Sequence, residues 1–336
     1  MVMQVNSHIN DCLLWQDNRA TATFKKVPED FIVNEILDWN FSGQGEHIFL
    51  YIEKTACNTA WLARQLARFY NVPPRDVGYS GLKDRHAVTR QYFSVRLPGV
   101  KAGRYDVPEH DEYRVISHVL HHKKLKRGNH QYNDFSIRLR EVSGDSDLIE
   151  ERLAFIRDNG CPNVFDSQRF GHNNNNLLRL AAWVNGEIEL RKRDEKSLVL
   201  SALRAAVFNR QLAERVQNDT WQQVLPGDRV ILDGSHSHFI PECIDDDINR
   251  RAIDKDIHPA GILVGAESDF CEKSQALTTL MHREHLKAAY RPLRLRVQNL
   301  SWQHDGSDCV ISMRLPSGGY ASGVIKQAPR HFRLST

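Results

Sequence analysis

Residues 80–89 read Ser-Gly-Leu-Lys-Asp-Arg-His-Ala-Val-Thr, and the N-terminal half of the protein can be interpreted outward from this stretch. Gly81 allows a tight turn, and Asp84 follows it between a lysine and an arginine. Residues 91–97, which come next, are rich in β-branched and aromatic side chains and predict a strand. We therefore expect Asp84 on a loop that leads directly into a strand, a common position for a catalytic group.

Two interpretations of Asp84 follow from the residue types. Glycine, aspartate and lysine are ordinary turn residues, so the stretch could be a solvated surface turn. Alternatively, nearby cations favour the ionised form of a carboxylate, which can then act as a nucleophile beside an anionic substrate. The residue types alone leave both interpretations open.

The pattern of side chains around this loop predicts an α+β fold. A helix capped by Asn58 or Thr59 is expected, with Leu62, Leu66 and Phe69 on its inner face, and it ends before Pro73-Pro74. Strands are expected over residues 31–36, 47–53, 91–97, 135–140, 228–232, 293–297 and 309–315. Helices are expected over residues 146–157, 174–184, 197–217 and 267–289. Strands, then helices, then strands again suggest one domain inserted into another, with an antiparallel or mixed sheet in the outer one.

Composition limits the class of protein. The chain has 336 residues, 41% of them hydrophobic and 26% charged, which is enough for two domains with substantial cores. Six cysteines are scattered without a C-x-x-C pair, so we expect reduced thiols, mostly buried. The first residues lack the basic start and apolar stretch of a secretory signal, and no apolar run could cross a bilayer. We expect a cytoplasmic protein without a membrane partner.

Positive charge is concentrated locally. The net charge is only +3, but a basic run is formed by Lys123, Lys124, Lys126 and Arg127. Lysine and arginine at such a run can contact nucleic-acid phosphates, which provide affinity with little sequence information. A solvated loop is the alternative interpretation.

Several cofactor and metal motifs are absent or incomplete. The sequence has no Walker A pattern and no G-x-G-x-x-G. The acidic run at residues 245–247 resembles the start of a calcium loop, but Arg250 stands where glycine is needed. We expect neither a cofactor nor a metal ion.

The string S-G-L-K-D-R-H-A-V-T-R-Q at residues 80–91 resembles the signature segment of the TruD family of tRNA pseudouridine synthases. Further segments resemble the family in the same order along the chain. They are K-K-V-P-E-D-F at 25–31, G-E-H at 45–47, N-T at 58–59, the spacing from His121 to Phe135, and the segment from Pro162 to Gly171. The resemblance implies an isomerase that converts a uridine of tRNA, usually uridine 13 in the D arm, to pseudouridine without a cofactor.

The resemblance also implies a domain organisation. Residues 1–158 and 295–336 would form a discontinuous catalytic domain of the pseudouridine-synthase type, interrupted by a family-specific α/β insertion domain at residues 159–294. It implies tRNA as the partner, and we expect no obligate protein partner.

Site residues follow from the same resemblance. Asp84 would be the nucleophile and Lys25 its paired cation. Phe135 would stack on the target base, and Phe31 and Asn133 would line the pocket; an asparagine amide can read the polar edge of uracil. Tyr320 stands where the family usually has phenylalanine, so its hydroxyl could form a hydrogen bond or face solvent. The basic run would contact the tRNA backbone.

Two other functions remain open at this point. A non-catalytic tRNA-binding or folding factor would need the basic run but no nucleophile. A metal-dependent nuclease would need clustered carboxylates near the basic run, and the sequence has none there. Whether Asp84 attacks ribose C1′ or uracil C6 is also open.

Overall fold

The computed structural model describes residues 6–17, 19–99, 106–270, 273–329 and 331–334. The contacts between residues divide the chain into two compact units. Unit 1 comprises Met1–Asp17, Asp158–Arg296 and Tyr320–Ala328, and unit 2 comprises Asn18–Arg157, Val297–Gly319 and Pro329–Thr336. The first and last segments of unit 1 lie outside the expected insertion domain, so contacts and family resemblance divide the chain differently there. The functional division stays a prediction.

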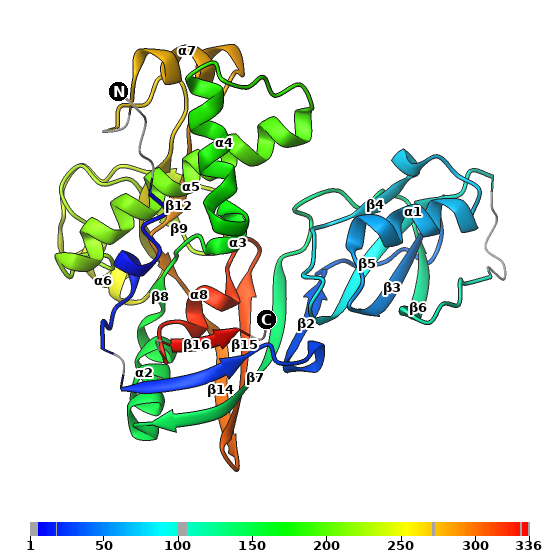
Figure 1. Cartoon of the computed structure of the whole chain (residues 1–336), viewed down its shortest axis with the longest axis horizontal. Helices are drawn as coiled ribbons and strands as arrows, with labels where there is room; N and C mark the ends of the chain where they lie inside the picture. Colours follow the sequence, from blue (N-terminus) through cyan, green and yellow to red (C-terminus); the bar gives the residue numbers. More distant parts are fainter. Residues whose placement is uncertain (1–5, 18, 100–105, 271–272, 330, 335–336) are drawn as a thin grey trace. The chain divides into compact units, whose positions relative to one another are not determined.

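Unit 2 is built on one mixed sheet (Figure 1). Within the described residues the sheet has ten strands; its main path runs β14-β15-β7-β2-β5-β3-β6, β1 joins β7 and β16, and β4 joins β5. The strands are β1 (Ala20–Phe24), β2 (Phe31–Ile36), β3 (His47–Thr55), β4 (Val77–Tyr79), β5 (Val88–Arg96), β6 (Tyr113–His121), β7 (Tyr132–Gly144), β14 (Gln298–Asp305), β15 (Asp308–Pro316) and β16 (His331–Leu334). β2 pairs in parallel with β5 but antiparallel with β7. The predicted α+β fold with a mixed sheet is therefore confirmed.

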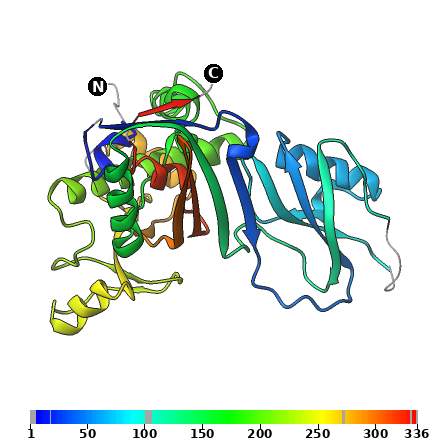
Figure 2. The ribbon, with the colours of Figure 1, turned by 90° about the horizontal axis from the view of Figure 1, so that it is seen from below.

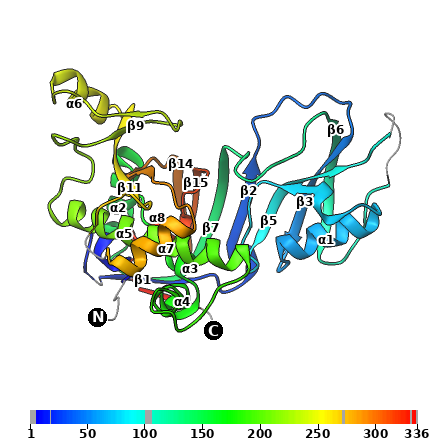
Figure 3. The same cartoon turned by 90° about the horizontal axis from the view of Figure 1, so that it is seen from above.

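Helix α1 (Thr59–Phe69) packs on the sheet of unit 2. The Asn58 side chain caps it by accepting hydrogen bonds from the backbone N–H groups of residues 60 and 61. Leu62 and Leu66 are fully buried among side chains of β3 and β5. Figures 2 and 3 show α1 against these strands from opposite sides. Phe69 is 47% exposed, so the prediction that it faces the core was wrong; Tyr70, one residue later, packs there instead.

Unit 1 has more helix than strand among its described residues, and its longest helix is the 25-residue α5 (Arg193–Gln217). The other helices are α3 (Ser167–Phe170), α4 (Asn175–Val184), α6 (Asp246–Ile253), α7 (Gln275–Arg283) and α8 (Ala321–Ile325), while α2 (Ser146–Asn159) ends at the start of unit 1. Its strands are β8 (Cys161–Pro162), β9 (Val230–Leu232), β10 (His238–Phe239), β11 (Ile257–Leu263), β12 (Ala289–Pro292) and β13 (Arg294–Leu295). Short 3-10 turns are η1 (Asn10–Cys12), η2 (Pro28–Asp30), η3 (Pro74–Asp76) and η4 (His172–Asn174). Figure 3 shows α6 at one end of unit 1, with α4 and α7 at the other.

The expected helix over residues 267–289 was wrong at both ends. Among the described residues of this range, only Gln275–Arg283 is helical; Ser274 caps its start, and His285, at φ 51°, follows its end. Residues 289–292 pair with β11 instead, because the ladder of an adjacent strand outweighs the helix propensity of Leu-Lys-Ala-Ala. The expected strand over 293–297 is reduced to Arg294–Leu295.

The cysteines are mostly buried. Cys12, Cys57, Cys161 and Cys309 are buried as expected, Cys243 is exposed, and Cys271 lies outside the described residues.

The acidic run at residues 245–247 begins a helix. Asp245 caps α6 by accepting a hydrogen bond from the N–H of Ile248 at 2.9 Å. In the described part of the chain, each helix is too short or too polar to cross a membrane.

Candidate active site

The parallel pairing of β2 and β5 brings Lys25 and Asp84 together. Ile32 of β2 is in register with Val88 of β5. Because parallel strands begin at the same edge of a sheet, the segments that precede them also meet there. Lys25 and Asp84 lie in these segments, and the Lys25 Nζ donates a hydrogen bond to Asp84 Oδ2. The two residues are 59 positions apart in the sequence.

The Lys25–Asp84 ion pair is shielded but accessible. The side chains are 13% and 21% exposed. The second carboxylate oxygen of Asp84 accepts a hydrogen bond from the backbone N–H of His86 at 3.0 Å, which orients the carboxylate. Lys25 has φ 57°, a left-handed conformation that is uncommon for lysine and often found at functional sites. A carboxylate with this charge partner and this exposure can meet a substrate.

An aromatic cluster adjoins the ion pair. The Lys25 Nζ lies 3.9 Å from the centre of the Phe31 ring, a cation–π contact. Phe31 packs edge-on against Phe135, with ring centroids 5.8 Å apart, and against Phe24 at 5.7 Å. Phe135 is half-buried on β7, opposite Val33 of β2. The structure therefore brings together Lys25, Asp84, Phe31 and Phe135, all of which were predicted site residues.

A second ion pair, between Lys83 and Glu35, is more deeply buried than the first. Glu35 and Asn133 are directly opposite each other on β2 and β7. The Lys83 Nζ lies 3.1 Å from Glu35 Oε2 and also donates a hydrogen bond to Asn133 Oδ1. Burial raises the pKa of Glu35 and lowers the pKa of Lys83, and their mutual attraction opposes both shifts. Glu35 also accepts a hydrogen bond from the backbone N–H of Tyr92 at 3.1 Å.

Buried polar contacts brace the loop that carries Asp84. The Thr59 hydroxyl accepts a hydrogen bond from the Lys83 N–H at 3.1 Å and donates one to Gln91, whose amide reaches the Gly81 carbonyl. Lys54 is 1% exposed and donates to the Cys57 carbonyl at 2.6 Å and to the Asp84 carbonyl at 3.5 Å. Burial lowers the pKa of Lys54 to about 8. The loop is therefore held by the sheet behind it.

His130 holds the start of the same loop. Its ring Nδ1 lies 2.5 Å from the Ser80 hydroxyl oxygen, which also accepts a hydrogen bond from the His130 N–H at 2.8 Å. Burial, and then the nearby positive charge of Lys83, lowers the pKa of His130 to about 4. A neutral imidazole can accept a hydrogen bond from the Ser80 hydroxyl at Nδ1.

The basic residues next to Asp84 in sequence have contacts of their own. Lys83 points to Glu35 and Asn133, Arg85 is exposed and donates to the Ala56 carbonyl at 3.3 Å, and the His86 side chain is exposed. The charge partner of Asp84 that the structure shows, Lys25, comes from another segment of the chain.

The basic run lies between β6 and β7. Lys123, Lys126 and Arg127 are exposed, whereas Lys124 is half-buried and donates to the Arg75 carbonyl. The Arg127 guanidinium lies 4.2 Å from the Tyr79 ring centre and donates to its hydroxyl at 2.8 Å. Positive charge on this run is therefore available to solvent, mainly from three of the four residues.

Tyr320 belongs to unit 1, unlike the other predicted pocket residues. Its hydroxyl accepts hydrogen bonds from Arg169 Nε at 2.9 Å and Nη2 at 2.6 Å, and its ring packs edge-on against Phe165. The hydroxyl of Tyr320 was expected either to form a hydrogen bond or to face solvent, and in the structure it forms hydrogen bonds.

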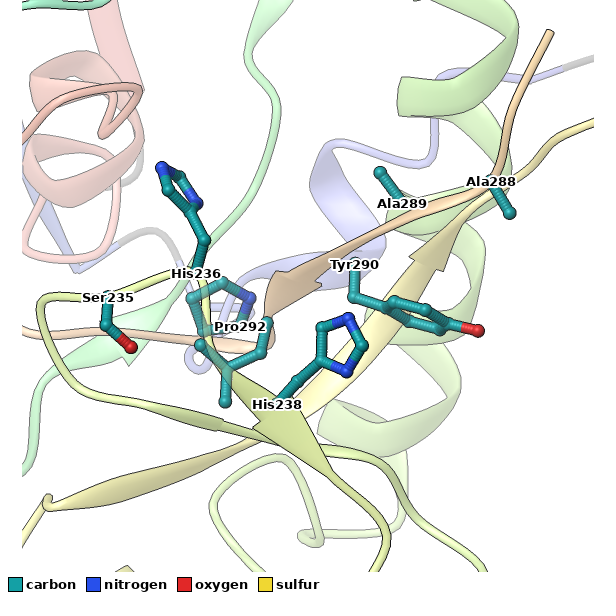
Figure 4. A pocket seen from close by; sticks show the side chains of 8 residues that line it. Ser235, His236, His238, Ala288, Ala289, Tyr290 and Pro292 are labelled. Atoms are coloured by element: carbon teal, nitrogen blue, oxygen red, sulfur yellow. The ribbon is translucent and has the colours of Figure 1, made fainter.

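A shallow pocket of about 280 Å³ also lies in unit 1 (Figure 4). The rings of His238 and Tyr290 meet edge to face there, with centroids 5.0 Å apart, and the Arg229 guanidinium lies 4.4 Å from the Tyr290 ring centre. Its lining residues are Ile231, Ser235, His236, His238, Ala288, Ala289, Tyr290 and Pro292. The predicted catalytic residues are all elsewhere, in unit 2.

Sequence reasoning missed the supporting residues of the site. Glu35 and Lys54 are charged residues within apolar strands, and both are almost fully buried. A charged side chain at an inward position of an alternating strand is a usable signal, because burial of an unpaired charge is costly. The hydroxyl and amide of Thr59 and Gln91 carry no such signal.

Comparison with known proteins identifies relatives of this chain. The family model described as tRNA pseudouridine synthase D (TruD) matches residues 9–188 and 190–328. A tRNA pseudouridine synthase D of Nitrosococcus oceani is 41% identical over 326 residues, covering 93% of this chain and 91% of that protein. The corresponding protein of Methylococcus capsulatus is 42% identical over 316 residues, covering 89% and 88%.

A solved structure shares the fold. The crystal structure of the putative tRNA pseudouridine synthase D from Methanosarcina mazei superposes with a TM-score of 0.69 at 17% identity, covering 98% of this chain and 99% of that one. Since the family model spans nearly the whole chain and relatives above 40% identity span most of it, the chain belongs to the TruD family of tRNA pseudouridine synthases.

Proposed function

We propose that this protein converts uridine 13 in the D arm of tRNA to pseudouridine, with Asp84 as the nucleophile. The reaction breaks the N-glycosidic bond, turns the uracil ring and joins it to the ribose through carbon, so it consumes no co-reactant. The observation that supports the proposal most directly is the Asp84 carboxylate, ion-paired and one-fifth exposed, beside the Phe31–Phe135 cluster. The target base must leave its stack to reach such a group.

Each neighbouring residue has a proposed role. Lys25 pairs with the Asp84 carboxylate and orients it. Phe135 stacks on the flipped base, a contact typically worth about 1–3 kcal/mol. Asn133 reads the polar edge of uracil, and Phe31 supports both Lys25 and Phe135. A carboxylate can attack ribose C1′ or uracil C6, and the proposal covers both routes.

The remaining assignments come from the family. We propose residues 1–158 and 295–336 as the catalytic domain and residues 159–294 as the insertion domain, with Tyr320 as a further pocket residue. The basic run is the proposed contact to the tRNA backbone, because three of its four side chains are exposed to solvent, where phosphates could reach them. The proposed compartment is the cytoplasm, where the substrate is found, and no protein partner is required.

One experiment tests the function. The protein is incubated with an unmodified tRNA transcript in EDTA, and pseudouridine is measured together with its position. Product at position 13 that falls about a thousandfold or more with Asp84→Asn, while tRNA binding persists, supports the proposal. Binding without product would instead indicate a non-catalytic tRNA-binding or folding factor. RNA cleavage that EDTA abolishes would indicate a nuclease.

A further inference from the structure

The Asn133 side chain is held in one orientation by its buried neighbours. Its Oδ1 accepts a hydrogen bond from the Lys83 Nζ. The ammonium of a lysine has three donors and no acceptor. A 180° flip of the Asn133 amide would place its NH₂ group against this ammonium, so the flip is disfavoured.

Lys83 itself cannot turn away. Its side chain is 7% exposed, and its Nζ lies 3.1 Å from Glu35 Oε2, where Glu35 is completely buried. Glu35 is fixed in turn by the Tyr92 N–H and by its place opposite Asn133 on the paired strands. Lys83 therefore lies between the carboxylate, with which it forms an ion pair, and the amide, to which it donates a hydrogen bond. We call Glu35, Lys83 and Asn133 the buried triad.

The orientation of an asparagine amide decides which pyrimidine it can read. With its NH₂ toward the base, the amide donates to O4 of uracil, and its oxygen still has a second lone pair for N3–H. Cytosine presents an amino group in place of O4, so the same pose would oppose two donors. A freely flipping asparagine could turn over and accept from that amino group instead.

We propose that the Lys83–Glu35 pair locks the Asn133 amide so that the site accepts uracil and rejects cytosine. Lys83 and Glu35 are positioning residues that determine specificity without touching the base. This inference rests on the proposed function, because it takes Asn133 to face the target base. Specificity of this kind uses an unfavourable contact against the wrong ligand as well as a favourable one for the right ligand.

The test measures discrimination by binding in the Asp84→Asn background, which prevents turnover. The Kd is determined for two tRNA transcripts that differ only in uridine or cytidine at the target position. We expect the parent to prefer uridine by about tenfold or more, since opposing donors leave buried polar groups unpaired. In the double variant Glu35→Leu/Lys83→Met the ratio should fall to about twofold or less, as the amide becomes free to flip.

Two further variants make the test decisive. Lys83→Gln replaces the ammonium by an amide that both donates and accepts, so it should also lower the ratio if the double variant does not fold. Lys26→Met is the matched control, because Lys26 is an exposed lysine whose partner is the exposed Glu141, and its ratio should equal the parent's. A folded Lys83→Gln or double variant that keeps the full ratio would overturn the proposal, as would a parent ratio near one.

Failure of the proposed role of Lys83 and Glu35 can be distinguished from failure of the proposed function. If the unsubstituted protein makes no pseudouridine from the uridine transcript, the proposed function fails first. If it makes pseudouridine while the triad variants discriminate as well as the parent, only the role of Lys83 and Glu35 is wrong.

Discussion

The adjacent residues Lys83 and Asp84 belong to two different lysine–carboxylate ion pairs, and the two pairs differ in their exposure to solvent. In the outer pair, Lys25 and Asp84 are 13% and 21% exposed; in the inner pair, Lys83 and Glu35 are 7% and 0% exposed. The outer pair can therefore meet a substrate, whereas the inner pair can act only on the residues around it. One turn of the chain thus carries a partly exposed carboxylate, the proposed nucleophile, next to a lysine that anchors the turn in the interior.

The same chemistry should have opposite consequences in the two pairs. An ion pair near solvent contributes little to stability, because water solvates each partner when the other is lost. A buried pair differs, because removing one partner leaves an uncompensated charge in the interior. Substitutions in the outer pair should therefore affect activity, and substitutions in the inner pair should affect stability first.

The largest expected effect is on the inner pair. Glu35→Leu leaves the Lys83 ammonium buried without its carboxylate and should lower the free energy of unfolding by about 3–5 kcal/mol. Adding Lys83→Met should restore most of that loss, because the second change removes the stranded charge. Denaturant unfolding of the two variants measures both values. A double variant no more stable than Glu35→Leu would show that the pair is not an energetic unit.

His130, which holds the start of the same loop, should make the stability of the protein depend on pH. The pKa of His130 is about 4 in the folded protein, against about 6.5 for an unfolded histidine. Between these values the unfolded chain binds the extra proton, so stability falls as the pH drops from 6.5 to 4, by about 3 kcal/mol in total for this group. Unfolding measured across this range should show a shallower loss for His130→Gln than for the unsubstituted protein.

The exposed His122 provides the control for that measurement. His122→Gln removes an exposed histidine and controls for the loss of a histidine side chain as such. If stability falls equally with pH in the His130→Gln variant and in the unsubstituted protein, the folded and unfolded states bind the His130 proton equally, and the lowered pKa is wrong.

The outer pair should show the reverse pattern. Lys25→Met removes the charge partner of Asp84 and should lower turnover about a hundredfold, the scale of one lost electrostatic contact at a reacting group. The free energy of unfolding should change by less than about 1 kcal/mol, because the pair is partly solvated. Lys26→Met, next in sequence but paired on the surface with Glu141, should leave turnover unchanged. Loss of stability with normal turnover per folded molecule would reverse the assignment of the two pairs.

The smallest effect is expected at the basic run, which is farther toward solvent. Lys126→Glu should weaken tRNA binding and lower the slope of log K against log salt by about one. Lys124→Glu should do less, because the Lys124 Nζ already donates to the Arg75 carbonyl. Lys192→Glu, at an exposed lysine of unit 1, is the control for charge change alone. A salt dependence that none of these variants alters would remove the basic run from the interface.

Some of this site could be predicted from the sequence because the signals are local. The loop before β5, the cap of α1 by Asn58 and five of the ten described strands in the sheet of unit 2 follow from turn residues and side-chain composition. The helix expected at 267–289 failed because the pairing of β12 with β11 is a tertiary interaction that competes with helix propensity. The partners of Asp84 and Lys83 could not be found by spacing, because they come from β2, β7 and the segment before β2.

By itself the sequence determined the TruD family through its motifs, and through that resemblance it predicted that Lys25 pairs with Asp84. The tertiary structure shows how the pairing arises, since the parallel register of β2 and β5 brings Lys25 to Asp84. Only the tertiary structure decided that Lys83 pairs with Glu35, which the antiparallel register of β2 and β7 places opposite Asn133. The physical reason is that propensity acts between neighbours in the chain, while burial and electrostatic pairing act between neighbours in space.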